Sequence, residues 1–238
     1  MPSEPFRYDH EGTACVGKIV FPDEYQGLKP AVLVAHTWAG CDKFAEGRAA
    51  WLASLGYVGV AIDMYGGGRV GASPEENRAM MQQIMSDRRV LQGRIIAAAK
   101  AAQQLPGVDS DRVAAIGFCF GGLCVLDLAR VGGPVRGVVS LHGMFTPPPL
   151  SLAPSSNRPA VLVLHGNDDP MAPPEQLAAL QNELSEHEHD WQLHTFGHTK
   201  HGFTNPAANS PATGVMYNAA AERRSWKLVA SFLDEVLA

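Results

Sequence analysis

The segment Gly117-Phe118-Cys119-Phe120-Gly121 places a cysteine between two glycines, directly after the β-branched segment 112–117 and before a helical one. A Gly-x-Cys-x-Gly turn in this context is the thiol form of the nucleophile elbow, a tight turn that lifts a nucleophile above the edge of a sheet. The crowded backbone there requires both glycines. The helix beginning at Phe120 directs its N-terminal dipole at the sulfur, which favours the reactive thiolate. We therefore predict that Cys119 is a nucleophile; the alternative is a small buried residue in a tight turn.

A thiol nucleophile needs a histidine that manages its proton and a carboxylate that orients the histidine. On folds with this elbow the three follow in the order nucleophile, acid, histidine. Asp169 stands directly after the apolar segment 160–165, and His201 lies between the last expected strand and the last expected helix. We predict Asp169 as the orienting acid, with Asp168 as the alternative, and His201 as the base.

Two backbone N–H groups are candidates for stabilising an oxyanion. One belongs to Phe120, immediately after the nucleophile, and the other to Trp38, in the loop after the first buried strand. Three histidines also end expected strands, namely His36, His142 and His165. Each of these is a pocket candidate, with a structural histidine as the equal alternative.

The remaining motifs predict neither a metal nor a cofactor. His194 and His198 precede His201, but no cysteine or acidic motif completes a ligand set. The glycine-rich segment 66–71 lacks the G-K-[ST] ending of a phosphate-binding loop, so we interpret it as a flexible loop. The four cysteines are few and irregularly spaced, which predicts reduced thiols.

The elements that must position these residues alternate between strand and helix. Strands are expected at 30–36, 57–63, 112–117, 135–141, 160–165 and 191–196, with an antiparallel edge strand at 14–21. Helices are expected at 43–55, 120–130 and 216–237, and helical spacing runs through 74–105, with Ser73-Pro74 as its start. The pattern predicts an α/β fold, a mostly parallel twisted sheet with helices on both faces. We interpret the proline-rich segment 146–159 as a loop rather than a linker, so residues 1–238 are expected to form one domain.

The composition argues against some classes of binding partner. The formal net charge is −5, the pI is about 6.0 and no Lys/Arg-rich run is present, which argues against nucleic acid as a partner. No apolar run is long enough to span a bilayer, and residues 1–10 lack the pattern of a secretion signal. We expect a cytoplasmic protein with no membrane partner, either a monomer or a homodimer.

Over nearly its whole length the chain resembles the dienelactone hydrolase family. The resemblance is carried by the segments 117–122, 56–65, 165–173 and 201–203, of which the cysteine elbow is the most specific. It implies an α/β-hydrolase fold and a Cys119-His201-Asp169 triad. It also implies hydrolysis of an ester or lactone through a thioester acyl-enzyme.

Two positions depart from the family pattern. Thr37 stands where a glutamate pairs with the resting cysteine, so we expect His201 to be the main activator of Cys119. Asn205 stands near the place of an arginine that binds a substrate carboxylate, which favours neutral esters, whereas Arg78 matches another such arginine only loosely. Together with His36, the pocket candidates are Thr37, Arg78 and Phe203.

Two further functions are compatible with the same residues. A thiol nucleophile beside an oxyanion hole can also attack a phosphotriester, which we expect as a promiscuous activity. The alternative to an enzyme is a non-catalytic thiol sensor or binding protein on the same fold. Site-selective oxidation of Cys119 without turnover of any activated ester would favour that alternative.

Overall fold

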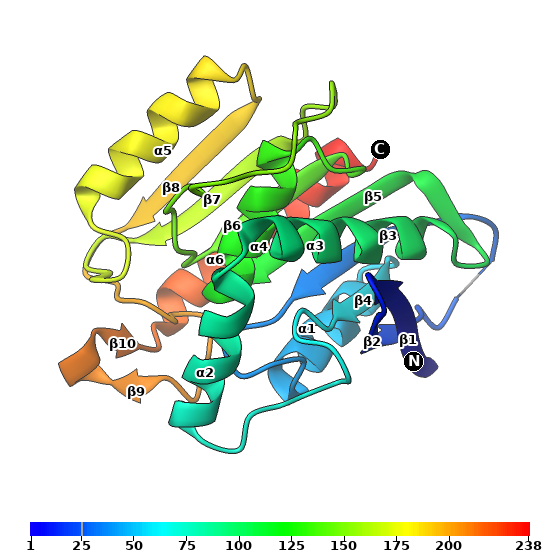
Figure 1. The fold of residues 1–238 in the computed structure, drawn as a ribbon, viewed down its shortest axis with the longest axis horizontal. Coiled ribbons are helices and arrows are strands. Elements are labelled where there is room, and N and C mark those ends of the chain that lie inside the picture. Colours follow the sequence, from blue (N-terminus) through cyan, green and yellow to red (C-terminus); the bar gives the residue numbers. More distant parts are fainter. Residues whose placement is uncertain (25) are drawn as a thin grey trace.

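One sheet forms the centre of the computed structural model, which describes residues 1–24 and 26–238 (Figure 1). Its strands are β1 (Ser3–His10), β2 (Thr13–Val20), β3 (Lys29–Ala35), β4 (Val58–Ile62), β5 (Val108–Phe118), β6 (Gly137–Leu141), β7 (Ala160–Gly166) and β8 (Trp191–Phe196). Their order across the sheet is β1-β2-β4-β3-β5-β6-β7-β8. From β4 to β8 every pair of neighbouring strands is parallel. The pairs β1–β2 and β2–β4 are antiparallel, so β2 is the strand that runs against the others.

Helices cover both faces of this sheet. They are α1 (Lys43–Ser54), α2 (Pro74–Met85), α3 (Arg88–Gln103), α4 (Phe120–Arg130), α5 (Pro174–Glu186) and α6 (Ala219–Val236). Buried side chains of α2, α3, α4 and α5 share one hydrophobic core with one face of the sheet, and those of α1 and α6 share a second core with the other. The predicted fold class is therefore confirmed.

The helical spacing through 74–105 corresponds to two helices rather than one. Ser73 caps α2, where its hydroxyl accepts a hydrogen bond from the N–H of Glu76 at 3.2 Å. Asp87 then caps α3, because its carboxylate accepts a hydrogen bond from the N–H of Arg89 at 3.0 Å. A cap residue with extended backbone cannot continue the preceding helix, so the chain changes direction between Met85 and Arg88.

The expectation that segment 14–21 forms the edge of the sheet is wrong. That segment is β2, which pairs with β4 on one side and with β1 on the other, so β1 is the edge strand. Phe6 and Tyr8 alternate with polar residues along β1 and are buried against the core. This alternation is the signal of a half-buried strand, and it was obscured by the polar character of the first ten residues.

The parallel register brings four loops to one edge of the sheet. Ala35 at the end of β3 pairs with Gly117 of β5, and Gly166 at the end of β7 pairs with Phe196 of β8. The loops that follow β3, β5, β7 and β8 therefore leave the sheet on the same side, where ligands bind in open α/β sheets. A short hairpin of β9 (Asn209–Ser210) and β10 (Val215–Met216) lies beyond this edge (Figure 1).

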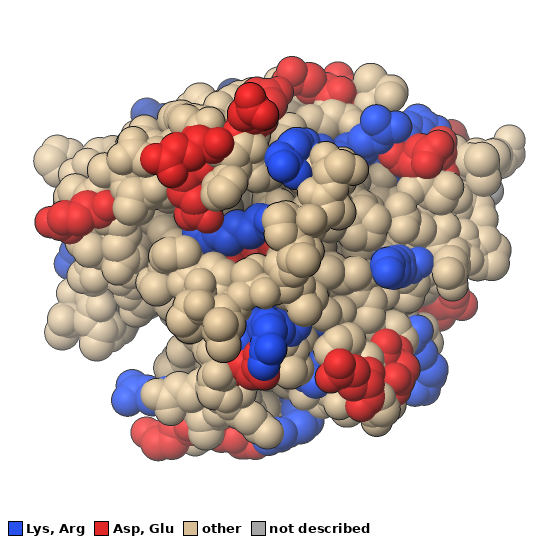
Figure 2. All heavy atoms as spheres, turned by 45° about the horizontal axis from the view of Figure 1, so that its top comes forward, with Lys and Arg blue, Asp and Glu red and all other residues tan. Residues whose placement is uncertain are grey.

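On the face shown in Figure 2, acidic and basic side chains are interspersed, and neither sign forms a continuous patch. Within residues 1–24 and 26–238, no helix has the length and apolar character needed to cross a bilayer.

Candidate active site

Cys119 occupies the turn between β5 and α4 in a backbone conformation that L-residues rarely adopt. Its φ is 56° and its ψ is −115°, and its N–H donates a hydrogen bond to the carbonyl oxygen of Leu141 at 3.1 Å. The side chain is partly exposed. Such strain persists only where the surroundings hold it, and it is typical of functional sites.

The glycines on either side allow the backbone to pack tightly around this turn. A Cβ on Gly117 would lie 2.0 Å from the carbonyl oxygen of Gly121. A Cβ on Gly121 would lie 2.1 Å from the carbonyl oxygen of Ala35, at the end of the neighbouring strand. Both distances are far inside van der Waals contact, so the turn can form in this place only with glycine at these two positions.

Asp169 and His201 form a buried hydrogen-bonded pair, although they are 32 residues apart in the sequence. Nδ1 of His201 lies 2.8 Å from Oδ2 of Asp169. The other carboxylate oxygen accepts a hydrogen bond from the N–H of Met171, also at 2.8 Å. Asp168, the alternative acid, is exposed and is bonded through its side chain to neighbouring Asn167. Of the two aspartates, Asp169 is the one that contacts the histidine.

The loop that carries His201 is held by backbone hydrogen bonds. Its partners lie just before β10 and within it. The N–H of His201 donates to the carbonyl oxygen of Gly214 at 3.0 Å, and its carbonyl oxygen accepts from the N–H of Met216 at 2.9 Å. The β9–β10 hairpin thus orients the main chain of the histidine, while Asp169 orients its ring.

The environment of His201 raises its pKa. Burial of the ring lowers this pKa, but the charge that Cys119 carries when ionised and the hydrogen bond to Asp169 outweigh burial and raise the pKa to about 10. Nε2 is buried and has no hydrogen-bond partner among the described residues. The raised pKa favours the protonated form of the ring, and Nε2 is the ring nitrogen left available for chemistry.

A second histidine packs against His201. The rings of His142 and His201 meet edge to face, with centroids 5.2 Å apart. Nε2 of His142 is hydrogen-bonded to the hydroxyl of Thr204 at 2.8 Å. Burial and the charge of His201 lower the pKa of His142 well below its ordinary value, so this ring is neutral. A histidine at a strand end was expected either to line the pocket or to have a structural role, and His142 fits the structural role.

The two N–H groups predicted as oxyanion donors make no hydrogen bond among the described residues. They are those of Trp38, after β3, and Phe120, the first residue of α4. The phenol of Tyr65 donates to the carbonyl oxygen of Trp38 at 2.9 Å, and its ring stacks on Phe120 with centroids 5.6 Å apart. Tyr65 thus contacts both donor residues. In the sequence, Tyr65 is recognisable only as the end of the segment 56–65, and its place just beyond a strand end is the signal that could have indicated this role.

The structure places the four pocket candidates differently from one another. His36 is wholly buried: its Nε2 accepts from the N–H of Met64 at 3.1 Å, and its Nδ1 donates to the carbonyl oxygen of Thr37. Phe203 is also wholly buried, in the core beneath α6. Neither exposes a surface to substrate, so the interpretation of these two as pocket-lining residues is corrected.

The other two candidates are accessible. Thr37 is partly exposed, and its hydroxyl accepts a 3.4 Å hydrogen bond from the N–H of Ala39 rather than contacting Cys119. Arg78 is exposed on α2. Asn205 caps a turn, where its side chain accepts from the N–H of Ala207 at 3.0 Å. Within the part of the chain that the structure describes, none of these residues is hydrogen-bonded to a triad residue, so a role in substrate binding stays a prediction.

The other thiols differ from Cys119 in their surroundings. Burial is the main cause that raises the pKa of Cys15 to about 11 and that of Cys41 to about 12. Burial also raises the pKa of Cys124 well above its ordinary value. These three sulfurs are therefore protonated at neutral pH. Among the residues the structure describes, no three His, Cys, Asp or Glu side chains are grouped as metal ligands.

Comparison with known proteins shows to which family the chain belongs. The model of the dienelactone hydrolase family matches residues 17–237. The chain belongs to the dienelactone hydrolase family. With that family it shares the α/β fold, and it is a hydrolase.

Two solved structures are similar to this chain over its whole length. One, named m3DLH, has a TM-score of 0.91 and 34% sequence identity, with 100% of this chain and 99% of that one covered. The other is the dienelactone hydrolase-like promiscuous phosphotriesterase P91 from metagenomic libraries, with a TM-score of 0.90, 33% identity and the same coverage. A probable 2-oxo-3-(5-oxofuran-2-ylidene)propanoate lactonase from Bradyrhizobium sp. is 27% identical over 193 residues, which cover 74% of each chain.

Proposed function

We propose that this hydrolase cleaves carboxylic esters or lactones through a Cys119-His201-Asp169 triad and a thioester acyl-enzyme. The observation that carries the proposal is the buried hydrogen bond between Asp169 and His201, with the charge of the Cys119 thiolate acting on the same imidazole. A nucleophile, a base and an orienting acid in this relation are the parts that acyl transfer requires.

In the first half-reaction the Cys119 thiolate adds to the ester carbonyl, and the carbonyl oxygen becomes an oxyanion. The N–H groups of Trp38 and Phe120 stabilise that charge. When the tetrahedral intermediate collapses, the bond to the leaving oxygen breaks and His201 gives its Nε2 proton to this oxygen. The products are an alcohol, or the free hydroxyl end of an opened lactone, and a thioester on Cys119.

In the second half-reaction water attacks the thioester and displaces the Cys119 sulfur from the acyl group. The neutral His201 takes a proton from the attacking water, and the same two N–H groups stabilise the second oxyanion. Collapse breaks the thioester bond, releases the carboxylic acid and restores the thiolate–imidazolium pair. Asp169 stays ionised throughout, because its function is to orient the ring and stabilise its charge.

Phosphotriesters are a second candidate substrate class. The observation that favours them is the likeness of the whole chain to the promiscuous phosphotriesterase P91. Attack of a thiolate on a phosphotriester also gathers negative charge on a former double-bonded oxygen, which the same N–H groups stabilise. We propose this as a slower activity of the same site.

The direct test combines turnover with trapping. A panel of p-nitrophenyl esters, lactones and a phosphotriester is assayed with wild type, Cys119→Ala and a control, Cys15→Ala, that removes a buried thiol distant in sequence from the elbow. We expect Cys119→Ala to lose roughly a thousandfold or more in kcat, and Cys15→Ala to keep the wild-type value. Mass spectrometry of a slow-ester mixture should show an acyl adduct on the peptide containing Cys119. An unchanged rate in Cys119→Ala, with no adduct, would show that the mechanism is wrong.

A further inference from the structure

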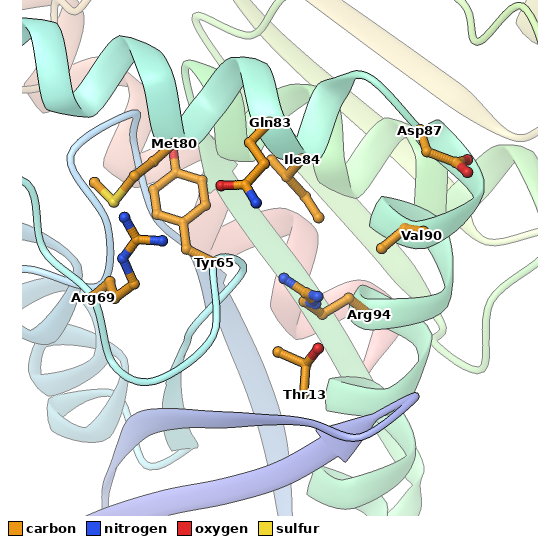
Figure 3. Close-up of a pocket in the computed structure, with 9 residues that line it drawn as sticks. All are labelled: Thr13, Tyr65, Arg69, Met80, Gln83, Ile84, Asp87, Val90 and Arg94. Carbon is orange, nitrogen blue, oxygen red and sulfur yellow. The ribbon is translucent and has the colours of Figure 1, made fainter.

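Tyr65, whose ring stacks on Phe120 next to the elbow, also lines a hollow in the surface. The hollow has a volume of about 250 Å³ and is formed by α2, the start of α3 and the glycine-rich loop after β4 (Figure 3). None of Cys119, His201 and Asp169 lines it. The volume is below the range typical of pockets for drug-sized ligands, so it fits a smaller molecule.

Two arginines line this pocket without a carboxylate partner. Arg94 is 7% exposed, and one of its terminal nitrogens, Nη1, donates to the carbonyl oxygen of Met64 at 2.9 Å. Its Nε is buried and has no hydrogen-bond partner. Neither Arg69 nor Arg94 forms an ion pair with any of the residues the structure describes. In Figure 3 both guanidinium groups point toward the space around Tyr65.

Two acidic residues lie near these arginines, but both are engaged elsewhere. Asp87 caps α3 and lies 3.5 Å from Arg89, and in Figure 3 its carboxylate points away from Arg69 and Arg94. Asp63 is wholly buried, and its carboxylate accepts four backbone N–H groups, those of Val16, Tyr65, Gly66 and Gly68. Neither carboxylate forms an ion pair with Arg69 or Arg94 among the described residues, and Nε of the buried Arg94 is left without a partner. A buried charge without a partner is costly, so it marks a place for a ligand of opposite sign.

The rest of the lining combines apolar side chains with polar ones. Met80 and Ile84 are buried on α2, and Val90 on α3 completes the wall, while the amide of Gln83 points inward between the two arginines (Figure 3). An inorganic anion would leave these apolar side chains without a partner. An anion attached to a small hydrocarbon body would contact both parts of the lining.

We propose that this pocket binds a small organic carboxylate. Its oxygens accept hydrogen bonds from Arg94 and Arg69, a geometry that guanidinium groups favour. Its hydrocarbon part packs on Met80, Ile84 and Val90. This binding does not depend on the reactivity of Cys119, so it stands apart from the proposed catalytic function.

The test compares benzoate with benzamide, which has nearly the same shape and no charge. Binding is measured by calorimetry and by NMR on wild type whose Cys119 has been alkylated with iodoacetamide, so that the catalytic thiol takes no part. We expect benzoate to bind about tenfold or more tightly than benzamide, because charge-assisted hydrogen bonds are lost with the neutral ligand. Equal affinities for the two ligands would overturn the proposal. Inorganic phosphate binding as tightly as benzoate would overturn the assignment to an organic acid.

Variants locate the binding. Arg69→Gln alters an exposed side chain and should fold normally, and it should weaken benzoate about tenfold. Arg94→Met removes the buried charge and should abolish binding if it folds; because its fold is at greater risk, Arg69→Gln decides the case alone. Lys100→Gln is the control: it removes a cation from the exposed surface of α3, the helix that carries Arg94, and should leave the affinity for benzoate unchanged. Wild-type affinity in Arg69→Gln, or an equal loss in Lys100→Gln, would contradict the proposal.

Discussion

Nδ1 of His201 lies 2.8 Å from Oδ2 of Asp169, inside the protein and at the carboxyl edge of the sheet. The second oxygen of the carboxylate is fixed by the N–H of Met171. An aspartate held at both oxygens has one orientation, and it imposes one on the ring. Nδ1 therefore carries a proton, and Nε2 is the nitrogen available for chemistry.

Replacing Asp169 by Asn should remove this control. The amide can hold the ring in the wrong tautomer and supplies no charge, so we expect kcat on p-nitrophenyl esters to fall by roughly a hundredfold to ten-thousandfold. Asp168→Asn is the matched control, because Asp168 is adjacent and exposed; it should retain wild-type kcat. The reverse result would transfer the role to Asp168.

Alkylation at neutral pH should be selective for one of the four thiols. Burial raises the pKa of Cys15, Cys41 and Cys124, so these sulfurs are protonated and unreactive. We expect limiting iodoacetamide at pH 7 to label Cys119 first, as measured by peptide mass spectrometry over time. His201→Ala should slow this labelling about tenfold or more, because the imidazolium that stabilises the thiolate is gone. Equal labelling rates in wild type and His201→Ala would show that His201 does not activate the cysteine.

The sequence was sufficient to predict the elements that local patterns determine. The strand at 191–196 is confirmed to the residue, and the helix expected at 43–55 ends one residue earlier, at Ser54. The elbow was predictable because steric crowding requires Gly117 and Gly121, which leaves a mark in the sequence. Chain order also predicted Asp169 as the partner of His201, and in the structure these two residues are hydrogen-bonded.

The features that sequence reasoning missed depend on distant contacts. Arg94 resembles any other arginine of a helix, and only the tertiary structure shows that it is buried without an anionic partner. Phe203 was expected at a pocket because it neighbours His201 in sequence, yet the turn at Gly202 directs it into the core. Burial of this kind is decided by packing between elements, which no local pattern contains.

The stability of the fold should depend on pH through His201. In the folded protein burial lowers the pKa of His201, but the charge of ionised Cys119 and the hydrogen bond to Asp169 raise this pKa to about 10, against 6.5 as the ordinary value. A raised pKa contributes stability that is complete below 6.5 and is lost as the pH rises through 10. We expect the difference in unfolding free energy between wild type and His201→Gln, measured in urea, to shrink between pH 6.5 and 10. A difference that grows with pH would have the wrong sign.

Steric crowding at the elbow gives a prediction about stability. Gly121→Ala places a Cβ 2.1 Å from the carbonyl oxygen of Ala35, so the elbow must shift away from β3. We expect a loss of about 2 kcal/mol or more in unfolding free energy, together with loss of activity. Gly47→Ala is the control, because Gly47 lies within α1 and its Cβ would meet no atom within 4 Å. That change should stabilise the protein by about 0.5–1 kcal/mol, as measured by urea unfolding.

Tyr65 should affect turnover although it is hydrogen-bonded to none of the triad residues. Its hydroxyl fixes the carbonyl oxygen of Trp38, and through that residue the N–H predicted to stabilise the oxyanion. Tyr65→Phe should lower kcat by about tenfold and leave KM nearly unchanged, because the donor acts on charge that exists only in the transition state. Tyr57→Phe is the control, since the Tyr57 hydroxyl makes no hydrogen bond among residues 1–24 and 26–238. If Tyr65→Phe lowered Tm but kept kcat, its hydroxyl would be a structural contact, and the loop after β3 would hold its donor without it.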